Sequence, residues 1–229
     1  MLRRFSPLLA VFVVALAVGY WFIQAAPTSK LAEFDLPFVA NAQNSTTSDT
    51  ETSIPEIIEM VLGSEDAPIT VIEYASFTCP HCSKFHQEVY KPLKKNYIDT
   101  NKVKFIFREV FFDKYGMWAS LVARCAGPDK FFGLTDMMLK TQNKWARADN
   151  DLAIVGELRK IGRLAGLDKE QLQSCLADGD KLRALVGWYK ENATRDQIKS
   201  TPSFIIDGEP YANMSYEEFS KILDEKLGS

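Results

Sequence analysis

Residues 69–93 read ITVIEYASFTCPHCSKFHQEVYKPL, and the expected fold is built around this segment. Its first part, Ile69–Ala75, is an apolar run rich in β-branched and aromatic residues, which is typical of a buried strand. Apolar residues then recur at helical spacing between Phe85 and Leu93, so we expect a helix to begin at or just before Cys82. The CPHC motif therefore lies where a strand passes into a helix.

The position of Cys79 at a helix N-terminus predicts a reactive thiolate. Unpaired backbone N–H groups and the positive end of the helix dipole favour a thiolate over a neutral thiol there. His81 adds a group that can be cationic near neutral pH. Pro80 fits the first helical turn, where its missing N–H has no partner to lose. A thiolate attacks disulfides, and Cys82 can close the intramolecular bond, so we interpret Cys79 as the nucleophile and Cys82 as its resolving partner.

A single C-x-x-C motif is also compatible with half of a zinc site or with a structural disulfide. Zinc usually takes four ligands, with a second pair of Cys or His at short spacing. The other two cysteines, Cys125 and Cys175, stand far apart in the sequence, and the histidines are His81 and His86. The sequence therefore favours redox chemistry, and we expect neither a metal nor a cofactor.

The composition argues against nucleic acid as a partner and leaves the substrate open. The chain has 229 residues, 46% of them apolar, and a formal net charge of −3. It lacks the basic surplus that nucleic-acid binding requires. The length suits one domain with an insertion.

The N-terminus carries an export signal. Arg3 and Arg4 precede an uncharged apolar stretch that spans residues 5–23. This run is about as long as a minimal transmembrane helix, and the small residues after it form an imperfect cleavage site. Residues 1–26 are therefore expected to be a signal peptide or a signal anchor, and the pattern leaves both open. Residues 27–55 are polar and are predicted to be a linker.

Export places the four cysteines in an oxidising compartment, where an even number indicates disulfides. Cys79 and Cys82 are partners in the redox motif. Cys125 and Cys175, on separate predicted helices, are then expected to form a structural disulfide. Two buried free thiols are the alternative.

The rest of the chain predicts a sheet interrupted by helices. We expect a short edge strand at residues 57–62 and a strand at residues 103–110, which runs parallel to the first strand because a helix connects them. Helices are expected at 115–126, 130–145, 151–165, 168–177 and 180–198, with Asp129, Asp151 and Asp168 as N-caps.

The C-terminal part returns to strand character. A strand is expected at residues 202–206, followed by a turn at Asp207-Gly208 and a return strand over residues 209–212. A final helix over residues 216–226 is expected to begin after Ser215, which is a suitable N-cap.

Together these features resemble the DsbA-type thiol-disulfide oxidoreductases of the thioredoxin-like superfamily, which are bacterial periplasmic proteins. The CPHC motif after a strand, the helical insertion, Thr201-Pro202 before the next strand, and the closing hairpin and helix carry this resemblance. It implies an α/β thioredoxin fold in which residues 56–112 and 199–229 form the thioredoxin-like domain. Residues 113–198 are then an inserted all-helical subdomain.

The resemblance also implies roles for individual residues. Cys79 is the exposed nucleophile and Cys82 the buried resolving cysteine, and the Pro80-His81 pair is typical of strongly oxidising members. Thr201-Pro202 matches a cis-proline loop whose backbone faces the nucleophile and pairs with an extended substrate peptide. Glu73 matches a buried acid that accepts the proton of the resolving thiol; the alternative is a strand-end carboxylate that faces solvent.

The function implied is that of an exported protein-disulfide oxidoreductase. It transfers its Cys79–Cys82 disulfide to reduced or partly unfolded exported proteins, and a DsbB-type membrane oxidant restores the disulfide. The implied location is the periplasm, with residues 5–23 as a single membrane anchor if the signal is not cleaved. A disulfide isomerase or reductase is the first alternative, and Thr201 is a residue found at this position in such proteins as well. A metal-binding or chaperone module with two thiolate ligands is the second.

Overall fold

The computed structural model describes residues 55–228. The predicted signal peptide or anchor at residues 1–26 lies outside the described residues, as does the predicted linker up to residue 54. Within residues 55–228, no helix is both long enough and apolar enough to span a membrane.

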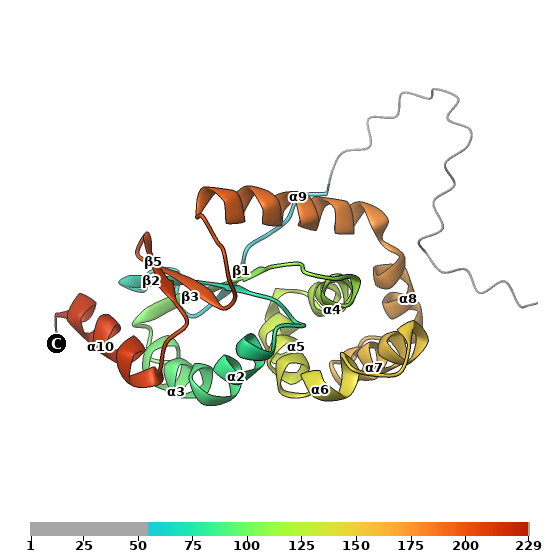
Figure 1. Cartoon of the computed structure of the whole chain (residues 1–229), viewed down its shortest axis with the longest axis horizontal. Helices are drawn as coiled ribbons and strands as arrows, with labels where there is room; N and C mark the ends of the chain where they lie inside the picture. The colour runs from blue at the N-terminus through green and yellow to red at the C-terminus, as the bar shows by residue number, and fades with distance from the viewer. Residues whose placement is uncertain (1–54, 229) are drawn as a thin grey trace, which may run out of the picture. The chain divides into compact units, whose positions relative to one another are not determined.

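A five-stranded mixed sheet forms the centre of the described fold (Figure 1). The strands are β1 (Met60–Leu62), β2 (Ile69–Ala75), β3 (Val103–Glu109), β4 (Ser203–Ile206) and β5 (Glu209–Ala212). Their spatial order is β1-β3-β2-β4-β5. β2 and β3 run parallel, as the helical connection between them predicts, and the other neighbours are antiparallel. The hairpin of β4 and β5 turns at Asp207-Gly208, as predicted.

The edge strand is shorter than predicted, because only Met60–Leu62 pairs with β3. Side chains hold the residues before it. Arg124 Nη1 donates a hydrogen bond of 2.9 Å to the carbonyl oxygen of Ile58, and Arg108 pairs with the Glu59 carboxylate at 3.1 Å. Arg124 thus satisfies a backbone carbonyl that a longer ladder would otherwise have used, and Arg108 holds the neighbouring side chain.

The helices are α2 (Pro80–Glu88), α3 (Tyr90–Leu93), the π-helical turn η1 (Lys94–Ile98), α4 (Lys114–Cys125), α5 (Pro128–Lys140), α6 (Gln142–Trp145), α7 (Asp151–Leu164), α8 (Lys169–Ala177), α9 (Gly179–Arg195) and α10 (Tyr216–Leu227). Helices α4 to α9 all lie between β3 and β4 in the sequence. The predicted α/β sheet domain with a helical insertion is therefore confirmed.

Different helices cover the two faces of the sheet (Figure 1). Residues such as Val71 on β2 and Phe204 on β4 pack on the face covered by α2 and α10. Tyr74 and Ile205 point the other way and pack against α9. Because side chains alternate along a strand, Glu73 shares the α2 face with Val71.

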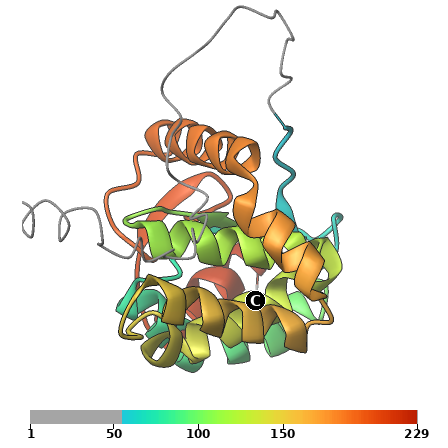
Figure 2. The same ribbon diagram turned by 90° about the vertical axis from the view of Figure 1, so that its right-hand side faces the viewer.

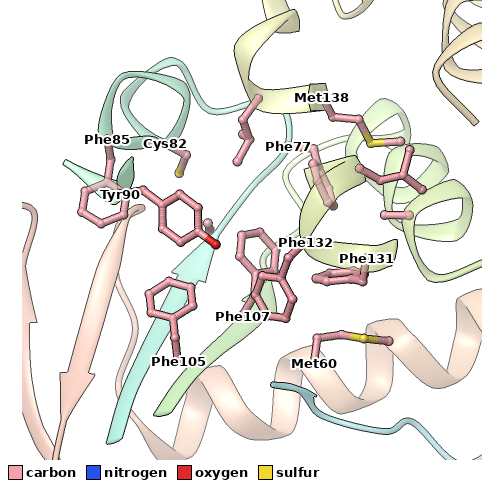
Figure 3. Packing of buried hydrophobic residues seen from close by; sticks show 14 of the residues in the cluster. Met60, Phe77, Cys82, Phe85, Tyr90, Phe105, Phe107, Phe131, Phe132 and Met138 are labelled. Carbon is pink, nitrogen blue, oxygen red and sulfur yellow. The ribbon is translucent and has the colours of Figure 1, made fainter. Parts of the chain in front are cut away.

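The main core joins the sheet to the helical insertion (Figure 3). Phe105 and Phe107 of β3 meet Phe132 and Phe131 of α5, with ring centroids 6.2 and 5.7 Å apart. Each such ring contributes about 1.5–3 kcal/mol when it is buried. The insertion is therefore packed onto the sheet as part of one core.

Helix α4 is the central helix of the insertion and packs against α5, α7, α8 and α9 (Figure 2). Gly162 of α7 permits one of these close approaches. A Cβ atom at Gly162 would lie 2.5 Å from Leu172 Cδ2 and 3.2 Å from Val122 Cγ1. A larger residue there would require the Leu172 and Val122 side chains to move.

Two helix boundaries differ from the prediction because of the local chain geometry. The expected helix over residues 130–145 is interrupted at Thr141, whose hydroxyl donates to the carbonyl oxygen of Met137 at 2.7 Å. The helix expected to reach residue 198 ends at Arg195, since Gln197 adopts a left-handed φ of 52°.

The predicted N-caps are partly correct. Asp168 forms a capping box with Gln171, and Ser215 caps α10 with a second one. Asp129 and Asp151 are not N-caps, because α5 begins at Pro128 after Gly127 and α7 begins after Asn150. The Asn150 side chain accepts the hydrogen bond from the Ala153 N–H.

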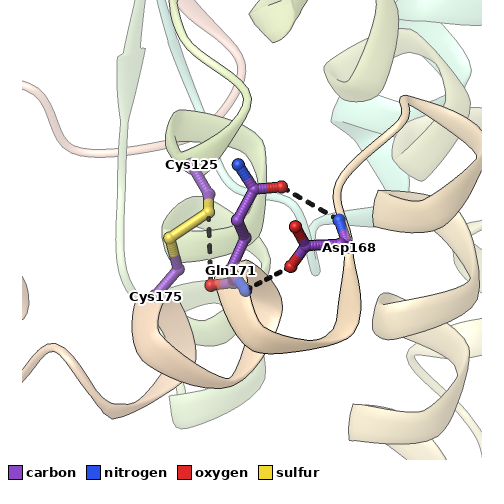
Figure 4. Close-up of a disulfide and its surroundings, with 4 residues drawn as sticks. All are labelled: Cys125, Asp168, Gln171 and Cys175. Carbon is purple, nitrogen blue, oxygen red and sulfur yellow. Dashed lines mark hydrogen bonds between the residues drawn. A yellow bond between two sulfur atoms is a disulfide. The ribbon is translucent and has the colours of Figure 1, made fainter.

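A disulfide joins Cys125 of α4 to Cys175 of α8 (Figure 4). The two Cα atoms are 6.0 Å apart, and 50 residues separate the cysteines in the sequence. The bond lies beside the capping box of Asp168 and Gln171. It cross-links two helices of the insertion.

We expect Cys125→Ala/Cys175→Ala to lower the free energy of unfolding, since the bond closes a loop of 50 residues. The chain-entropy model assigns about 4 kcal/mol to a loop of this length. For a domain of this size the melting temperature should fall by roughly 10 °C. Calorimetry with the Cys79–Cys82 pair kept reduced measures the shift, and the exposed Ser174→Ala serves as the control. An unchanged melting temperature would contradict the expectation.

Candidate active site

The CPHC motif occupies the junction of β2 and α2, as predicted. β2 ends at Ala75, and the Cys79 N–H closes a turn by donating to the carbonyl oxygen of Ser76 at 3.1 Å. Cys79 is the N-cap of α2, and Pro80 is the first helical residue. The Cys79 sulfur is thereby set at the end of the helix where backbone N–H groups lack helical partners.

These surroundings lower the pKa of the Cys79 thiol from 9.0 to about 5. The largest cause is a hydrogen bond from Cys82, and the Thr201 side chain and the backbone N–H groups of Cys82 and His81 act in the same direction. Burial opposes them, because it disfavours the charged form. The exposed position that the resemblance implies for Cys79 is wrong in this structure, since the residue is buried. The His81 contribution comes from its backbone, while the residue itself is exposed.

Cys82 has the opposite character. It is fully buried, and burial raises the pKa of its thiol far above the ordinary range. The hydrogen bond with Cys79 and the charge of Glu73 raise this pKa further. Figure 3 shows Cys82 beside Phe85 and Tyr90 at the edge of the aromatic core. The motif thus contains one thiol that ionises easily and one that stays protonated.

The loop before β4 brings Thr201 and Pro202 to the motif. The Thr201–Pro202 peptide bond is cis, Pro202 is buried and Thr201 is half-buried. The Cys79 thiol donates a hydrogen bond of 3.4 Å to the carbonyl oxygen of Thr201. These residues meet because β2 and β4 are neighbours in the sheet, although 122 residues separate Cys79 from Thr201.

Glu73 is fully buried on the α2 face of the sheet, so the alternative of a solvent-facing carboxylate is wrong. Its Oε2 lies 2.9 Å from Nε2 of His86, which is 1% exposed. Sequence reasoning missed this role of His86. The available signal was its position four residues after Cys82, which places both side chains on one face of the helix.

Gln142 is a second residue that sequence reasoning missed. Its side-chain nitrogen donates to the carbonyl oxygens of Phe77 and Cys79 at 2.8 and 2.9 Å. A further bond joins the same parts of the protein, from Ser83 Oγ to the carbonyl oxygen of Leu139 at 2.6 Å. The helical insertion therefore holds the backbone of the motif in place.

A surface pocket of about 400 Å³ opens beside the motif, between α2 and the segment before α10. His81, Phe85, Val89 and Met214 are among its lining residues. Within residues 55–228, no three His, Cys, Asp or Glu side chains are grouped to hold a metal ion.

Residues 56–225 match the family model described as "Thioredoxin". A Rickettsia prowazekii protein named "Putative protein-disulfide oxidoreductase" is 36% identical over 171 residues, which cover 74% of this chain and 61% of that protein. The chain thus spans less than two thirds of the length of this relative. Disulfide bond formation protein D of Bacillus subtilis is 25% identical over 178 residues, which cover 73% of this chain and 76% of that protein.

Solved structures show the same fold. The crystal structure of Wolbachia pipientis alpha-DsbA1 matches with a TM-score of 0.70 and 26% identity, over 77% of this chain and 94% of that chain. Oxidised BdbD from Bacillus subtilis matches with a TM-score of 0.65 and 24% identity, over 75% of this chain and 94% of that chain.

We expect the Cys79 thiolate of the reduced protein to titrate with a midpoint of about 5, which ultraviolet absorbance near the thiolate band measures. Cys79→Ser should lack the transition, and a midpoint near the ordinary 9.0 would contradict the assignment.

Because folding lowers this pKa, the thiolate stabilises the reduced protein fully above pH 9.0, and the stabilisation is lost as the pH falls through about 5. The melting temperature of the reduced form, measured relative to that of the oxidised form, should therefore be highest above pH 9.0 and should fall as the pH is lowered through about 5.

Proposed function

The chain belongs to the thioredoxin family as a DsbA-like member, and on this premise we propose that it is an exported protein-disulfide oxidoreductase. It transfers its Cys79–Cys82 disulfide to reduced or partly unfolded proteins during oxidative folding. The observation that carries the proposal is the opposite acidity of the two thiols, with a lowered pKa at Cys79 and a raised pKa at Cys82.

The transfer proceeds by two thiol–disulfide exchanges. A substrate thiolate attacks the Cys79 sulfur, the Cys79–Cys82 bond breaks, and Cys82 leaves with the electron pair and takes up a proton. The second substrate thiolate then attacks the substrate sulfur of the mixed disulfide and releases Cys79 as a thiolate. The substrate loses two electrons and the enzyme gains them. The low pKa of Cys79 favours this last release, because a stable thiolate is a good leaving group.

Two features beside Cys79 suit an unfolded substrate. The Thr201 backbone lies against the Cys79 sulfur, where an extended peptide can form main-chain hydrogen bonds. The pocket lined by His81, Phe85 and Met214 offers apolar contact to a substrate side chain next to the reacting cysteine. Both features accept many sequences, which fits a protein that oxidises diverse substrates.

Turnover requires an oxidant that restores the disulfide, and we assign this role to a DsbB-type membrane partner. The apolar stretch at residues 5–23 supports export to the periplasm, either as a cleaved signal or as an anchor. It lies outside the described residues, so this part of the proposal rests on the sequence.

A disulfide isomerase or reductase is the second candidate function, since it uses the same dithiol. Thr201 before the proline favours it, because that residue also occurs in such proteins. Its reaction needs a supply of electrons instead of an oxidant. A metal-binding or chaperone module predicts stoichiometric zinc or copper on Cys79 and Cys82, which elemental analysis of the purified protein measures.

We expect Cys79→Ser to abolish oxidation of a reduced, unfolded test protein, because the nucleophile is lost. With oxidised glutathione as the oxidant, Cys82→Ser should accumulate a mixed disulfide between Cys79 and glutathione, because the resolving thiol that would displace glutathione is missing. Thiol trapping followed by mass spectrometry distinguishes the two results. Cys125→Ala/Cys175→Ala is the control and should keep its activity. Equal behaviour of the two motif variants would overturn the roles assigned to Cys79 and Cys82.

The direction of the reaction follows from the reduction potential of the Cys79–Cys82 pair. We expect a value of about −120 mV, as for a strong oxidant, since the thiolate stabilises the reduced form. A value of about −270 mV would make the protein a reductase. Equilibration with glutathione buffers measures the potential in a Cys125→Ala/Cys175→Ala background, which leaves a single dithiol.

A further inference from the structure

The Glu73–His86 pair is unusual because it is buried in otherwise apolar surroundings. The two residues are 0% and 1% exposed, and the ring of His86 stacks on Tyr90 with centroids 4.5 Å apart. The rings of Phe85 and Phe107 lie 5.7 and 6.1 Å from it. Burial of two ionisable side chains costs free energy unless each is well paired. A pair that is this costly to bury is expected to serve a function of the protein.

The pairing inside the core is incomplete. His86 Nε2 lies 2.9 Å from Glu73 Oε2, but Glu73 Oε1 and His86 Nδ1 have no hydrogen-bond partner among the described residues. A buried N–H without an acceptor is costly. The arrangement therefore favours a ring that carries its hydrogen on Nε2 and donates it to Oε2. The second carboxylate oxygen, Oε1, is then left free to accept a proton.

The pair lies next to the resolving thiol. Cys82 and His86 are one helical turn apart on the same face of α2. The Glu73 carboxylate is close enough for its charge to act on the Cys82 thiol. Since Cys82 is fully buried, bulk water does not reach its sulfur directly. Any proton that leaves Cys82 must pass to a neighbouring group.

We propose that His86 is a positioning residue of the redox reaction, which acts on the Cys82 thiol through its hydrogen bond to the Glu73 carboxylate. This inference rests on the proposed function. The ring fixes the carboxylate by one oxygen and leaves the other oxygen to take the proton of Cys82. An apolar residue at position 86 would leave the carboxyl group without a partner, which favours its neutral form and removes the proton acceptor.

The step concerned is the re-formation of the Cys79–Cys82 disulfide after Cys79 has reacted with an oxidising disulfide. In the mixed disulfide, Cys82 transfers its proton to Glu73 and attacks the Cys79 sulfur. The Cys79–Cys82 bond forms, the bond from Cys79 to the other sulfur breaks, and that sulfur leaves as a thiolate with the electron pair. The oxidising disulfide is reduced by two electrons, and the enzyme dithiol is oxidised.

Few other ionisable groups face the pair. Cys82 does so from α2, and its thiol is in turn hydrogen-bonded to Cys79, the N-cap of that helix. Tyr90 does so from α3. Burial raises the pKa of its hydroxyl, and the charges of Glu73 and of Asp136, which lies on α5, raise it further. Tyr90 therefore stays protonated. β3 and β4 contribute the apolar rings of Phe107 and Phe204. Tyr90 and these rings therefore offer no alternative acceptor for the proton of Cys82.

The experiment mixes the reduced full chain with oxidised glutathione in the Cys125→Ala/Cys175→Ala background and follows the Cys79–glutathione mixed disulfide by rapid acid quench and mass spectrometry. His86→Phe keeps the ring volume and removes the donor. It should leave formation of the mixed disulfide unchanged and slow its resolution on the order of 10²-fold, within the range of positioned proton transfer. His86→Gln keeps an N–H donor and should resolve close to the wild-type rate. Glu73→Gln should resolve the mixed disulfide as slowly as His86→Phe. The double variant Glu73→Gln/His86→Phe should resolve it no more slowly than either single variant.

Leu185→Ala is the control for a general loss of stability, because Leu185 of α9 is fully buried and belongs to an apolar cluster separate from the one that contains Cys79 and Cys82. It should resolve the mixed disulfide at the wild-type rate. Resolution by His86→Phe at the wild-type rate would overturn the inference. If the parent protein forms no mixed disulfide at all, the proposed function fails instead.

His86→Leu decides the matter if His86→Phe does not fold, because it also removes the donor and has a smaller side chain. It should resolve the mixed disulfide as slowly as Glu73→Gln, and resolution at the wild-type rate would overturn the inference. Recovery of the rate in His86→Gln is the result that a purely structural role of the ring does not predict, since glutamine replaces the donor but not the ring.

Discussion

The interaction between the Cys79 sulfur and the N-terminus of α2 is the constraint on which the rest of the structure depends. Cys79 is only 7% exposed, yet its thiol has a pKa of about 5. Backbone N–H groups of the first helical turn and the Cys82 thiol point at the sulfur and favour its negative charge. This requires β2 to end at Ala75 and α2 to begin at Pro80, and the sheet and the core serve to fix these two points.

The helical insertion contributes to the site as well as to the core. Gln142 binds the backbone on both sides of Thr78, and the Thr78 hydroxyl donates to Asp113 at 2.7 Å. Asp113 is also the N-cap of α4, since its other oxygen accepts from the Gly116 N–H at 2.9 Å. The same residues that start the helices of the insertion thus hold the motif. A displacement of the insertion would move the backbone around Cys79.

Two buried pairs of ionisable side chains show how differently the fold treats structural and reactive groups. Arg124 and Glu109 are 6% and 1% exposed, and the guanidinium binds both carboxylate oxygens, at 2.5 and 2.7 Å. Each oxygen of Glu109 is satisfied, as a structural ion pair requires. Glu73 and His86 share a single hydrogen bond and each keep one unpaired atom. The fully satisfied pair holds α4 to β3, and the partly satisfied pair lies where a thiol must exchange a proton.

The sequence by itself determined the local chemistry of this protein. The bounds of β2, the helix start at the motif, the Asp207-Gly208 hairpin and the Ser215 cap all follow from residues close together in the chain. Local pattern is sufficient there, because strand alternation, helix capping and the helix dipole act over a few residues.

The family resemblance implies that the Thr201 backbone faces Cys79, but only the tertiary structure decided which other distant groups meet the two cysteines. The Gln142 amide lies 63 residues from Cys79 in the sequence, and the pairing of Glu73 with His86 joins a strand face to a helix face. Periodicity assigns a side chain to a face but does not say what the opposite element presents to it. Those contacts arise when the sheet, α2 and the insertion pack into one core, because burial then forces each polar group to find a partner.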